Sequence, residues 1–203
     1  YGVIAMAFLV VSLTQALFDF GATTALLRKE TLTVDDINSA WTLTVIQGSF
    51  GGLVLLGLSP FAGAYFREPE VERVLWVLAA CLLLSGFTNI GIALARKELN
   101  FAVEFKYMVG IKLVGILSSM VAAYFLRDYR ALLVGVMAGY LSGFGLSYAL
   151  HPYRPGWNTR KMADIWALTK WLMLAGVGGF LLRKSDELIA ARIGSAHEFG
   201  QIG

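Results

Sequence analysis

A few ionised side chains interrupt long apolar stretches of this sequence, and their types suggest chemistry. Lys112 lies inside one such stretch, with Glu104 two helical turns before it. An ionised group near the middle of a membrane costs at least about 2.5–3.5 kcal/mol, so it usually faces a cavity or a partner. Three interpretations of Lys112 stay open: a cation that lines a cavity, a side chain that reaches back to the cytoplasmic interface, or a structural link to Glu104.

A second group of charges lies near the end of the sequence, with apolar residues on both sides. It consists of Arg183, Lys184, Asp186 and Glu187. Arg183 and Glu187 are four positions apart, a spacing that allows an ion pair on one helix face. Because four charges in under two turns could not face lipid, they must face protein or water, or mark a helix end. This pattern favours a hydrophilic cavity.

One acidic residue, Asp19, ends the first apolar run. A carboxylate at a helix C-terminus opposes the helix dipole, so we expect a specific partner, such as a backbone N–H or Arg28. Both a simple cap and a role in gating or ion pairing are consistent with this position.

Nothing in the sequence indicates a hydrolytic, metal or nucleic-acid site. His151 and His197 have no Cys or carboxylate at ligand spacing, and no phosphate-binding glycine loop or nucleophile elbow occurs. Cys81 is the single cysteine and lies in an apolar run, which predicts a small buried residue. Basic residues do not alternate with aromatic ones, so no nucleic-acid partner is expected. No cofactor is predicted.

The elements that must position these charges are membrane-spanning helices. The sequence is 57% hydrophobic and only 15% charged, against roughly a quarter charged in soluble domains. Continuous apolar runs reach the length of about 20 residues that a spanning helix needs. We therefore predict an all-α, polytopic transmembrane helix bundle of about six spans. Their ranges are 1–18, 43–66, 74–95, 106–126, 131–150 and 171–191.

Two longer connectors, residues 19–42 and 151–170, are predicted to lie at the membrane interface. Thr33, followed by early acidic residues, is typical of a helix start near residues 31–41. A short interfacial helix is expected after Pro155. Its apolar face would consist of Met162, Ile165, Trp166, Leu168 and Trp171.

The distribution of Lys and Arg predicts the orientation. Connectors 19–42, 96–105 and 151–170 carry more basic residues than the opposite connectors, so they are expected to be cytoplasmic. Glycines four positions apart predict close helix packing. They are Gly48 and Gly52 in the second span, and Gly135, Gly139 and Gly143 in the fifth.

Several short motifs follow one another in an order found in a known family. They are Tyr1-Gly2-Val3-Ile4-Ala5-Met6, Asp19-Phe20-Gly21, Arg28-Lys29, Asp36-Ile37-Asn38, Leu58-Ser59-Pro60-Phe61-Ala62, the run 93–101 and the run 183–192. With these motifs the sequence resembles the polysaccharide transporter branch of the multidrug/oligosaccharidyl-lipid/polysaccharide exporter superfamily, which contains Wzx-type flippases and colanic-acid exporters. Lys184 and Glu187 depart from the family pattern, where Asn is more frequent.

This resemblance implies that the chain is a fragment of a two-lobe transporter. Residues 1–150 would form most of the N-terminal lobe, residues 151–170 a cytoplasmic interfacial linker, and residues 171–203 the truncated first helix of the C-terminal lobe. The implied function is a flippase that moves an undecaprenyl-pyrophosphate-linked oligosaccharide across the bacterial inner membrane by alternating access. Implied partners are this lipid-linked oligosaccharide, membrane lipids, a polysaccharide polymerase and chain-length proteins.

Intramembrane charge suggests a role for each candidate residue in such a transporter. Lys112, Arg183 and Lys184 are the expected contacts for the anionic cargo. Expected gating or ion-pair residues are Asp19, Glu104, Asp186 and Glu187. The alternatives are a drug–cation antiporter of the same superfamily, a membrane-embedded polysaccharide-assembly enzyme and a structural membrane scaffold. A coupling ion, H⁺ or Na⁺, stays undefined.

Overall fold

The computed structural model describes residues 2–18 and 21–167, together with a few single positions between 169 and 182. Within them the chain forms α1 (Gly2–Phe18), α2 (Ala22–Arg28), α3 (Val34–Phe66), α4 (Pro69–Gly86), α5 (Gly91–Lys97), α6 (Phe101–Leu126) and α7 (Arg130–Leu150). A short helical segment follows at residues 162–167. The described part of the chain contains no strand, so the predicted all-α architecture is confirmed.

Three helices, α3, α6 and α7, are each long and apolar enough to cross a membrane. Two bent pairs, α1 with α2 and α4 with α5, would bring the number of spans to five if each pair is one span. These five elements correspond to the first five predicted spans. The sixth predicted span, 171–191, lies almost entirely outside the described residues.

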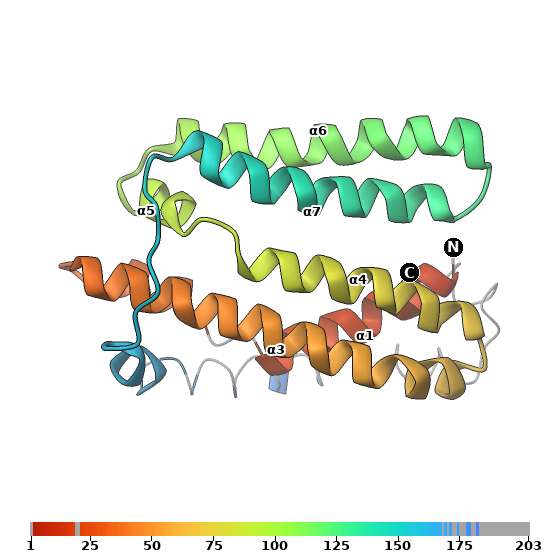
Figure 1. Ribbon diagram of the computed structural model, residues 1–203, viewed down its shortest axis with the longest axis horizontal. Coiled ribbons are helices and arrows are strands. Elements are labelled where there is room, and N and C mark those ends of the chain that lie inside the picture. Colours follow the sequence, from red (N-terminus) through yellow and green to blue (C-terminus); the bar gives the residue numbers. More distant parts are fainter. Residues whose placement is uncertain are drawn as a thin grey trace.

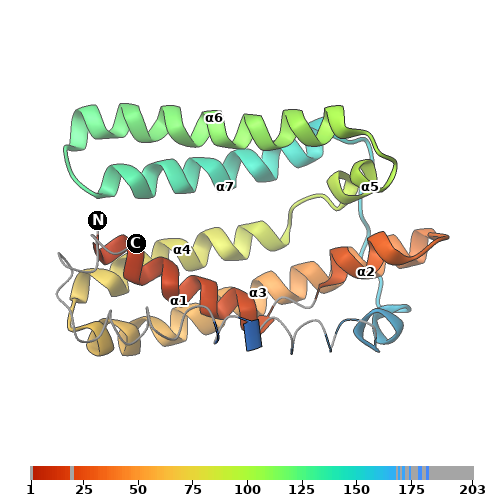
Figure 2. The same cartoon turned by 180° about the vertical axis from the view of Figure 1, so that it is seen from behind.

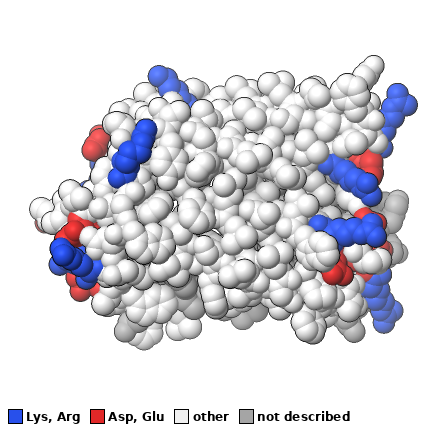
Figure 3. All heavy atoms as spheres, in the orientation of Figure 1, with Lys and Arg blue, Asp and Glu red and all other residues white. Residues whose placement is uncertain are grey.

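The helices lie roughly along one direction in two groups. α6 and α7 form one antiparallel hairpin, and α3, α4 and α1 form the other group (Figures 1 and 2). α4 joins the groups because it contacts α3, α1 and α7. In the view of Figure 3, Lys, Arg, Asp and Glu gather at the two ends, and the broad band between them is almost free of charge. A helix bundle with an uncharged belt between two charged ends is suited to a membrane.

The predicted interfacial helix near residues 31–41 is not a separate element. Thr33 and Asp36 form a capping box, as expected for a helix start, but α3 then continues without a break to Phe66. No helix breaker stands between Val34 and the predicted span, so the helix propagates through it. At 1.5 Å per residue α3 is about 50 Å long, more than the hydrocarbon thickness of about 30 Å.

The predicted third span, 74–95, is broken rather than continuous. α4 ends at Gly86, and α5 begins at Gly91 after a bend of 60°. The hydroxyl groups of Ser85 and Thr88 donate to main-chain carbonyls three residues earlier. Such bonds compete with the helical pattern. The apolar composition of this run continues through the break and therefore concealed it.

An apolar core lies between α1, α3 and α4 at the end of the bundle where α3 turns into α4. Its fully buried members include Met6, Leu55, Val71 and Leu75. Cys81 is buried, as its sequence context predicted.

Glycines bring helices close together, as predicted. A Cβ added at Gly48 would lie 2.6 Å from Cα of Gly86, so α3 and α4 touch backbone to backbone. On the other hairpin, a Cβ added at Gly135 would lie 2.7 Å from the main-chain oxygen of Gly115. Small residues at these positions permit the close approach.

Candidate functional site: a polar cavity at two helix breaks

A cavity of about 310 Å³ lies beside the two helix breaks, within the size range of small-molecule sites. α1, α2, α3, α4, α5 and α6 all contribute to its wall. Its polar lining residues are Thr14, Gln15, Thr23, Thr44, Gln47, Ser85, Thr88, Asn89, Arg96 and Tyr107. Irregular backbone at membrane depth is tolerated where it is buried in protein or lines a water-filled cavity.

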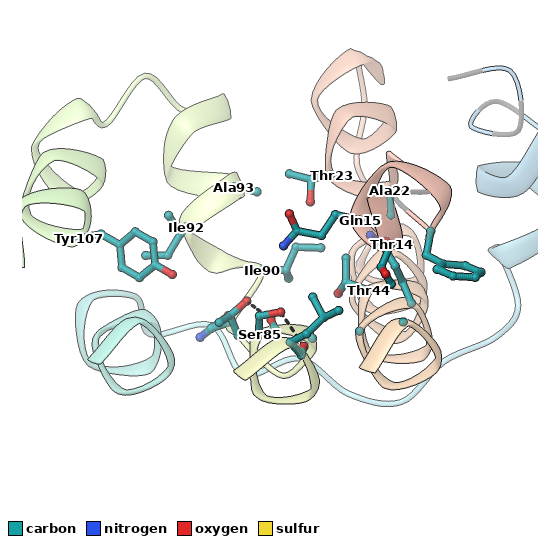
Figure 4. A pocket seen from close by; sticks show the side chains of 18 of the residues that line it. Thr14, Gln15, Ala22, Thr23, Thr44, Ser85, Ile90, Ile92, Ala93 and Tyr107 are labelled. Carbon is teal, nitrogen blue, oxygen red and sulfur yellow. Dashed lines mark hydrogen bonds between the residues drawn. The ribbon is translucent and has the colours of Figure 1, made fainter. Parts of the chain in front are cut away.

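Neutral polar side chains converge on this space from different helices. Figure 4 shows Gln15 of α1, Thr23 of α2 and Thr44 of α3 on one side and Tyr107 of α6 across from them. Thr14 donates its hydroxyl hydrogen to the Val10 carbonyl at 2.9 Å, a bond that satisfies the donor within its own helix. The hydroxyl oxygens keep acceptor capacity, so this lining suits a ligand rich in hydroxyl groups.

Asn89 holds the break between α4 and α5 in its position. Its side chain is buried, with 3% of the residue exposed. The backbone N–H of Asn89 donates to the Ser147 hydroxyl at 2.9 Å, and its Nδ2 donates to the Tyr153 carbonyl at 2.6 Å. Its Oδ1 accepts from the N–H of Gly91 at 2.8 Å. One residue of the cavity wall is thereby linked to α7, to α5 and to the segment after α7.

Arg96, in the last turn of α5, is the one cation among the described residues that line the cavity. Its Nε donates to Oε1 of Glu104 at 2.8 Å, and Nη2 contacts the same oxygen. A guanidinium has five N–H donors, and the pair with Glu104 uses Nε and Nη2, so the Nη1 donors lie outside this pair. The side chain is 46% exposed. Arg96 can therefore keep Glu104 and still bind a phosphate.

An extended segment, residues 151–161, follows α7 and is called the strap here. It crosses one face of α3 whose polar members are Asp35, Asn38, Ser39 and Thr42. Asn38 Oδ1 accepts from the Tyr153 hydroxyl at 2.9 Å and from the Gly156 N–H at 2.8 Å. Thr42 Oγ1 accepts from the Asn158 N–H at 3.0 Å, Asp35 accepts from the Asn158 amide, and Ser39 accepts from the Lys161 N–H.

Tyr153 and Trp41 complete the connection between the strap and the cavity wall. Burial raises the pKa of the Tyr153 phenol, so the hydroxyl stays protonated and donates to Asn38. Trp41 donates from Nε1 to the Thr88 carbonyl at the helix break, and its ring packs edge-on against Trp157 of the strap. The break and the strap therefore share contacts on α3, and a shift of one must disturb the other.

The structure places two of the residues that the sequence singled out. Glu104 of α6 is paired with Arg96 of the preceding helix, α5. The interpretation of Lys112 as a structural partner of Glu104 is therefore wrong. Lys112 is exposed and lines a different hollow, between α6 and α7. The other candidates lie outside the described residues: Asp19, Arg183, Lys184, Asp186 and Glu187.

Sequence reasoning missed the cavity because most of its polar residues are neutral. Thr14 with Gln15, and Thr44 with Gln47, stand inside predicted spans without altering their apolar character. Arg96 was assigned to a cytoplasmic connector, where basic residues are ordinary. A search for Gln and clustered hydroxyl residues inside the apolar runs would have found part of this wall.

The fold and the site thus define a polytopic helical membrane protein with a half-open cavity that has polar side chains in its wall. The sequence profile of a family described as "Polysaccharide biosynthesis protein" matches residues 1–202, and the chain belongs to this family. A Klebsiella pneumoniae protein, named "Uncharacterized membrane protein in cps region", is 24% identical over 171 residues, 81% of this chain and 34% of that protein. The chain spans about a third of the length of this relative. No solved structure matches the chain significantly.

Proposed function

We propose that the chain is part of an exporter that moves a lipid-pyrophosphate-linked oligosaccharide across the bacterial inner membrane by alternating access. The observation that carries this proposal is the polar cavity at the two helix breaks, with Arg96 among its lining residues. Membership of the polysaccharide biosynthesis family and the name of the Klebsiella relative support the cargo class. Because the chain spans about a third of that relative, the activity belongs to the whole protein.

The lining of the cavity fits the head of such a lipid. A pyrophosphate-sugar group cannot cross hydrocarbon because its charges and hydroxyls would lose their hydration. Gln15, Gln47, Thr44 and Tyr107 offer donors and acceptors for sugar hydroxyls. Arg96 supplies a charge-assisted contact for a phosphate oxygen.

The lining of the cavity also favours this cargo over an organic cation. A drug–cation antiporter requires acidic groups that neutralise its cargo. Among the described lining residues there is no carboxylate, and the nearby Glu104 is already paired with Arg96. The proposed roles of Arg183 and Lys184 as further cargo contacts, and of Asp19, Asp186 and Glu187 in gating or ion pairing, stay predictions.

The test uses the full-length protein in a strain that lacks its own exporter. Arg96→Ala is expected to lower surface polysaccharide about tenfold or more, since a hydrogen bond to a charged group contributes about 1.5–3 kcal/mol. Arg73→Ala is the matched control, because Arg73 is exposed, pairs with Glu70 and lies in the first half of α4, away from the cavity. Lipid-linked oligosaccharide should accumulate in the Arg96→Ala strain.

Two results would contradict the proposal. The first is normal surface polysaccharide when Arg96→Ala is combined with Gln47→Leu at unchanged protein abundance. The second is efflux of organic cations that depends on these two residues, which would favour the antiporter. Loss of polysaccharide with both the Arg96 and the Arg73 variant would show a general folding defect, so membrane abundance and elution in detergent are measured in parallel.

A further inference from the structure

A second hollow lies on the α6–α7 hairpin, along the seam between its two helices. This seam groove has a volume of about 360 Å³ and is lined by Lys112, Gly115, Ile116, Ser119, Met120 and residues of α7 that include Gly135. Its floor is formed where the two backbones approach: a Cβ added at Gly135 would lie 2.6 Å from Cβ of Ser119. Small residues on the floor and larger apolar ones on the rim leave a slot that no side chain fills.

Lys112 gives the seam groove a single charged position. Its Cα lies about 16 Å along α6 from Phe101, at 1.5 Å per residue, in a helix of 26 residues. No carboxylate in the described part of the chain lies within ion-pair distance of its ammonium. A lysine at this depth must therefore reach toward the interface or meet an anion.

The groove runs from Lys112 toward the C-terminal end of α6. This direction matches a lipid of the leaflet at the N-terminal end of α6. Lining residues Ile116, Ser119 and Met120 follow Lys112 toward the C-terminal end of α6, and Leu132, near the start of the antiparallel α7, lies at that same end. Side chains of a helix lean toward its N-terminus, so the ammonium lies nearer the bilayer surface than the slot. A lipid whose phosphate binds Lys112 can extend its tail down the slot toward the bilayer centre.

We propose that the seam groove binds the polyprenyl phosphate carrier of the cargo, with a phosphate oxygen on the Lys112 ammonium and the first part of the tail in the slot. This inference rests on the proposed function, which supplies the carrier. Charge complementarity selects an anionic head, and one slot takes one hydrocarbon chain, whereas a phospholipid has two. The sugar head then lies outside the slot, and the rest of the tail stays in lipid.

The test is photo-crosslinking in full-length protein reconstituted into nanodiscs of phosphatidylethanolamine and phosphatidylglycerol with a small fraction of undecaprenyl phosphate. A benzophenone amino acid replaces Ile116 in one variant and Leu117 in another. Both residues are exposed to similar extents, 56% and 59%, but only Ile116 lines the seam groove. Capture of undecaprenyl phosphate from position 116 is expected to exceed capture from position 117 about fivefold.

The charge is tested in the same experiment. Lys112→Ala should lower capture at position 116 about fivefold, since one cation near a membrane surface contributes about 1 kcal/mol toward an anionic lipid. Lys106→Ala is the matched control, because Lys106 is also an exposed lysine of α6 and does not line the groove. The protein that keeps Lys112 should capture uncharged undecaprenol no better than the Lys112→Ala protein captures undecaprenyl phosphate.

Equal capture at positions 116 and 117, or capture of phospholipid in proportion to its abundance, would overturn the proposal and mark the seam as ordinary lipid-facing surface. Capture unaffected by Lys112→Ala would overturn the phosphate contact. Neither result depends on transport, so the seam-groove proposal can fail while Arg96→Ala still lowers export. The reverse outcome is equally distinguishable.

Discussion

The two halves of the bundle each contain a buried apolar cluster, but only one of them adds a network of polar contacts, although α3 runs through both. At the end where α3 turns into α4, contacts are apolar: Leu55, Val71 and Leu75 are fully buried against α1. At the end where α5 and the strap lie, α3 presents Asn38 and Thr42, whose side chains bind another segment by hydrogen bonds. Both helix breaks and the polar cavity belong to this second half.

This difference indicates which half can rearrange. An apolar core packs like a jigsaw and resists small displacements. Hydrogen-bonded groups beside a water-filled cavity can exchange one partner for another at low cost, because water replaces a lost bond. We therefore expect the apolar half to act as a fixed support, and the polar half to carry the movements of the proposed alternating access.

The polar contacts at the outer end of the apolar half differ from those of the strap. Tyr129, before α7, donates its hydroxyl to Glu70 of α4, and this hydrogen bond raises the pKa of the Tyr129 phenol. Arg73 pairs with the same carboxylate at 2.8 Å. This polar cluster joins α4 to the α6–α7 hairpin at the end away from the strap, where Leu133 and Val136 of α7 also pack against the apolar core. It closes that end of the bundle with far fewer polar contacts than the strap makes.

The largest effect on stability is expected in the apolar half. Leu75→Ala should lower the free energy of unfolding by about 2–5 kcal/mol, because it leaves a cavity in a core that cannot collapse. Leu53→Ala should change little, since 61% of Leu53 is exposed. Thermal unfolding in detergent measures both. Similar losses for the two variants would contradict the description of this half as a packed core.

A smaller effect on stability but a larger one on export is expected for Asn89→Ala. The change leaves the Gly91 N–H without its acceptor, at about 1–3 kcal/mol for a buried group. The Tyr153 carbonyl loses one donor but keeps Arg154 as the other. Hydrogen–deuterium exchange should rise in the strap, residues 151–161, and not in α7.

The control for Asn89→Ala is Asn100→Ala, because Asn100 precedes α6 without forming a side-chain cap. Unchanged exchange in the strap of the Asn89→Ala protein would show that the break and the strap are not coupled. The two would then not move together.

The smallest effect is expected for Tyr153→Phe, which removes one hydrogen bond to Asn38 and keeps the ring. The loss should be about 0.5–1.5 kcal/mol, with increased exchange confined to the strap. Tyr124→Phe is the comparison, since 75% of Tyr124 is exposed. A loss in the apolar half from Tyr153→Phe would show that the two halves are not independent.

Hydropathy alone predicted the helices whose surroundings are uniform. Residues 131–150 were expected as a span and α7 covers Arg130–Leu150, while α6 ends at Leu126 as predicted. Both helices form one hairpin, held by small residues that the sequence pattern showed. Continuous apolar composition suffices here because the lipid and the partner helix place similar demands on every turn.

The polar half was harder to predict because its determinants are distant in sequence. Asn89 bonds to Tyr153, 64 positions away, and Asn38 bonds to Gly156, 118 positions away. Neither pairing leaves a periodic signal. The break after Gly86 also hides inside an apolar run, and Arg96 resembles any basic residue of a connector. Local composition identified the spans, whereas the site depends on tertiary contacts.

The central claim is that the cavity at the helix breaks is a water-accessible binding site, and cysteine labelling tests it most directly. Gln47→Cys and Gly57→Cys, both in a Cys81→Ser background, place a thiol on the cavity wall and on an α3 surface with no neighbour within 4 Å. A membrane-impermeant maleimide should modify the Gln47 variant of the full-length protein, and lipid-linked oligosaccharide should protect it. The Gly57 variant, whose thiol lies outside the cavity on an apolar span, should resist. A folded Gln47 variant that resists the reagent from both sides of the membrane would contradict the account.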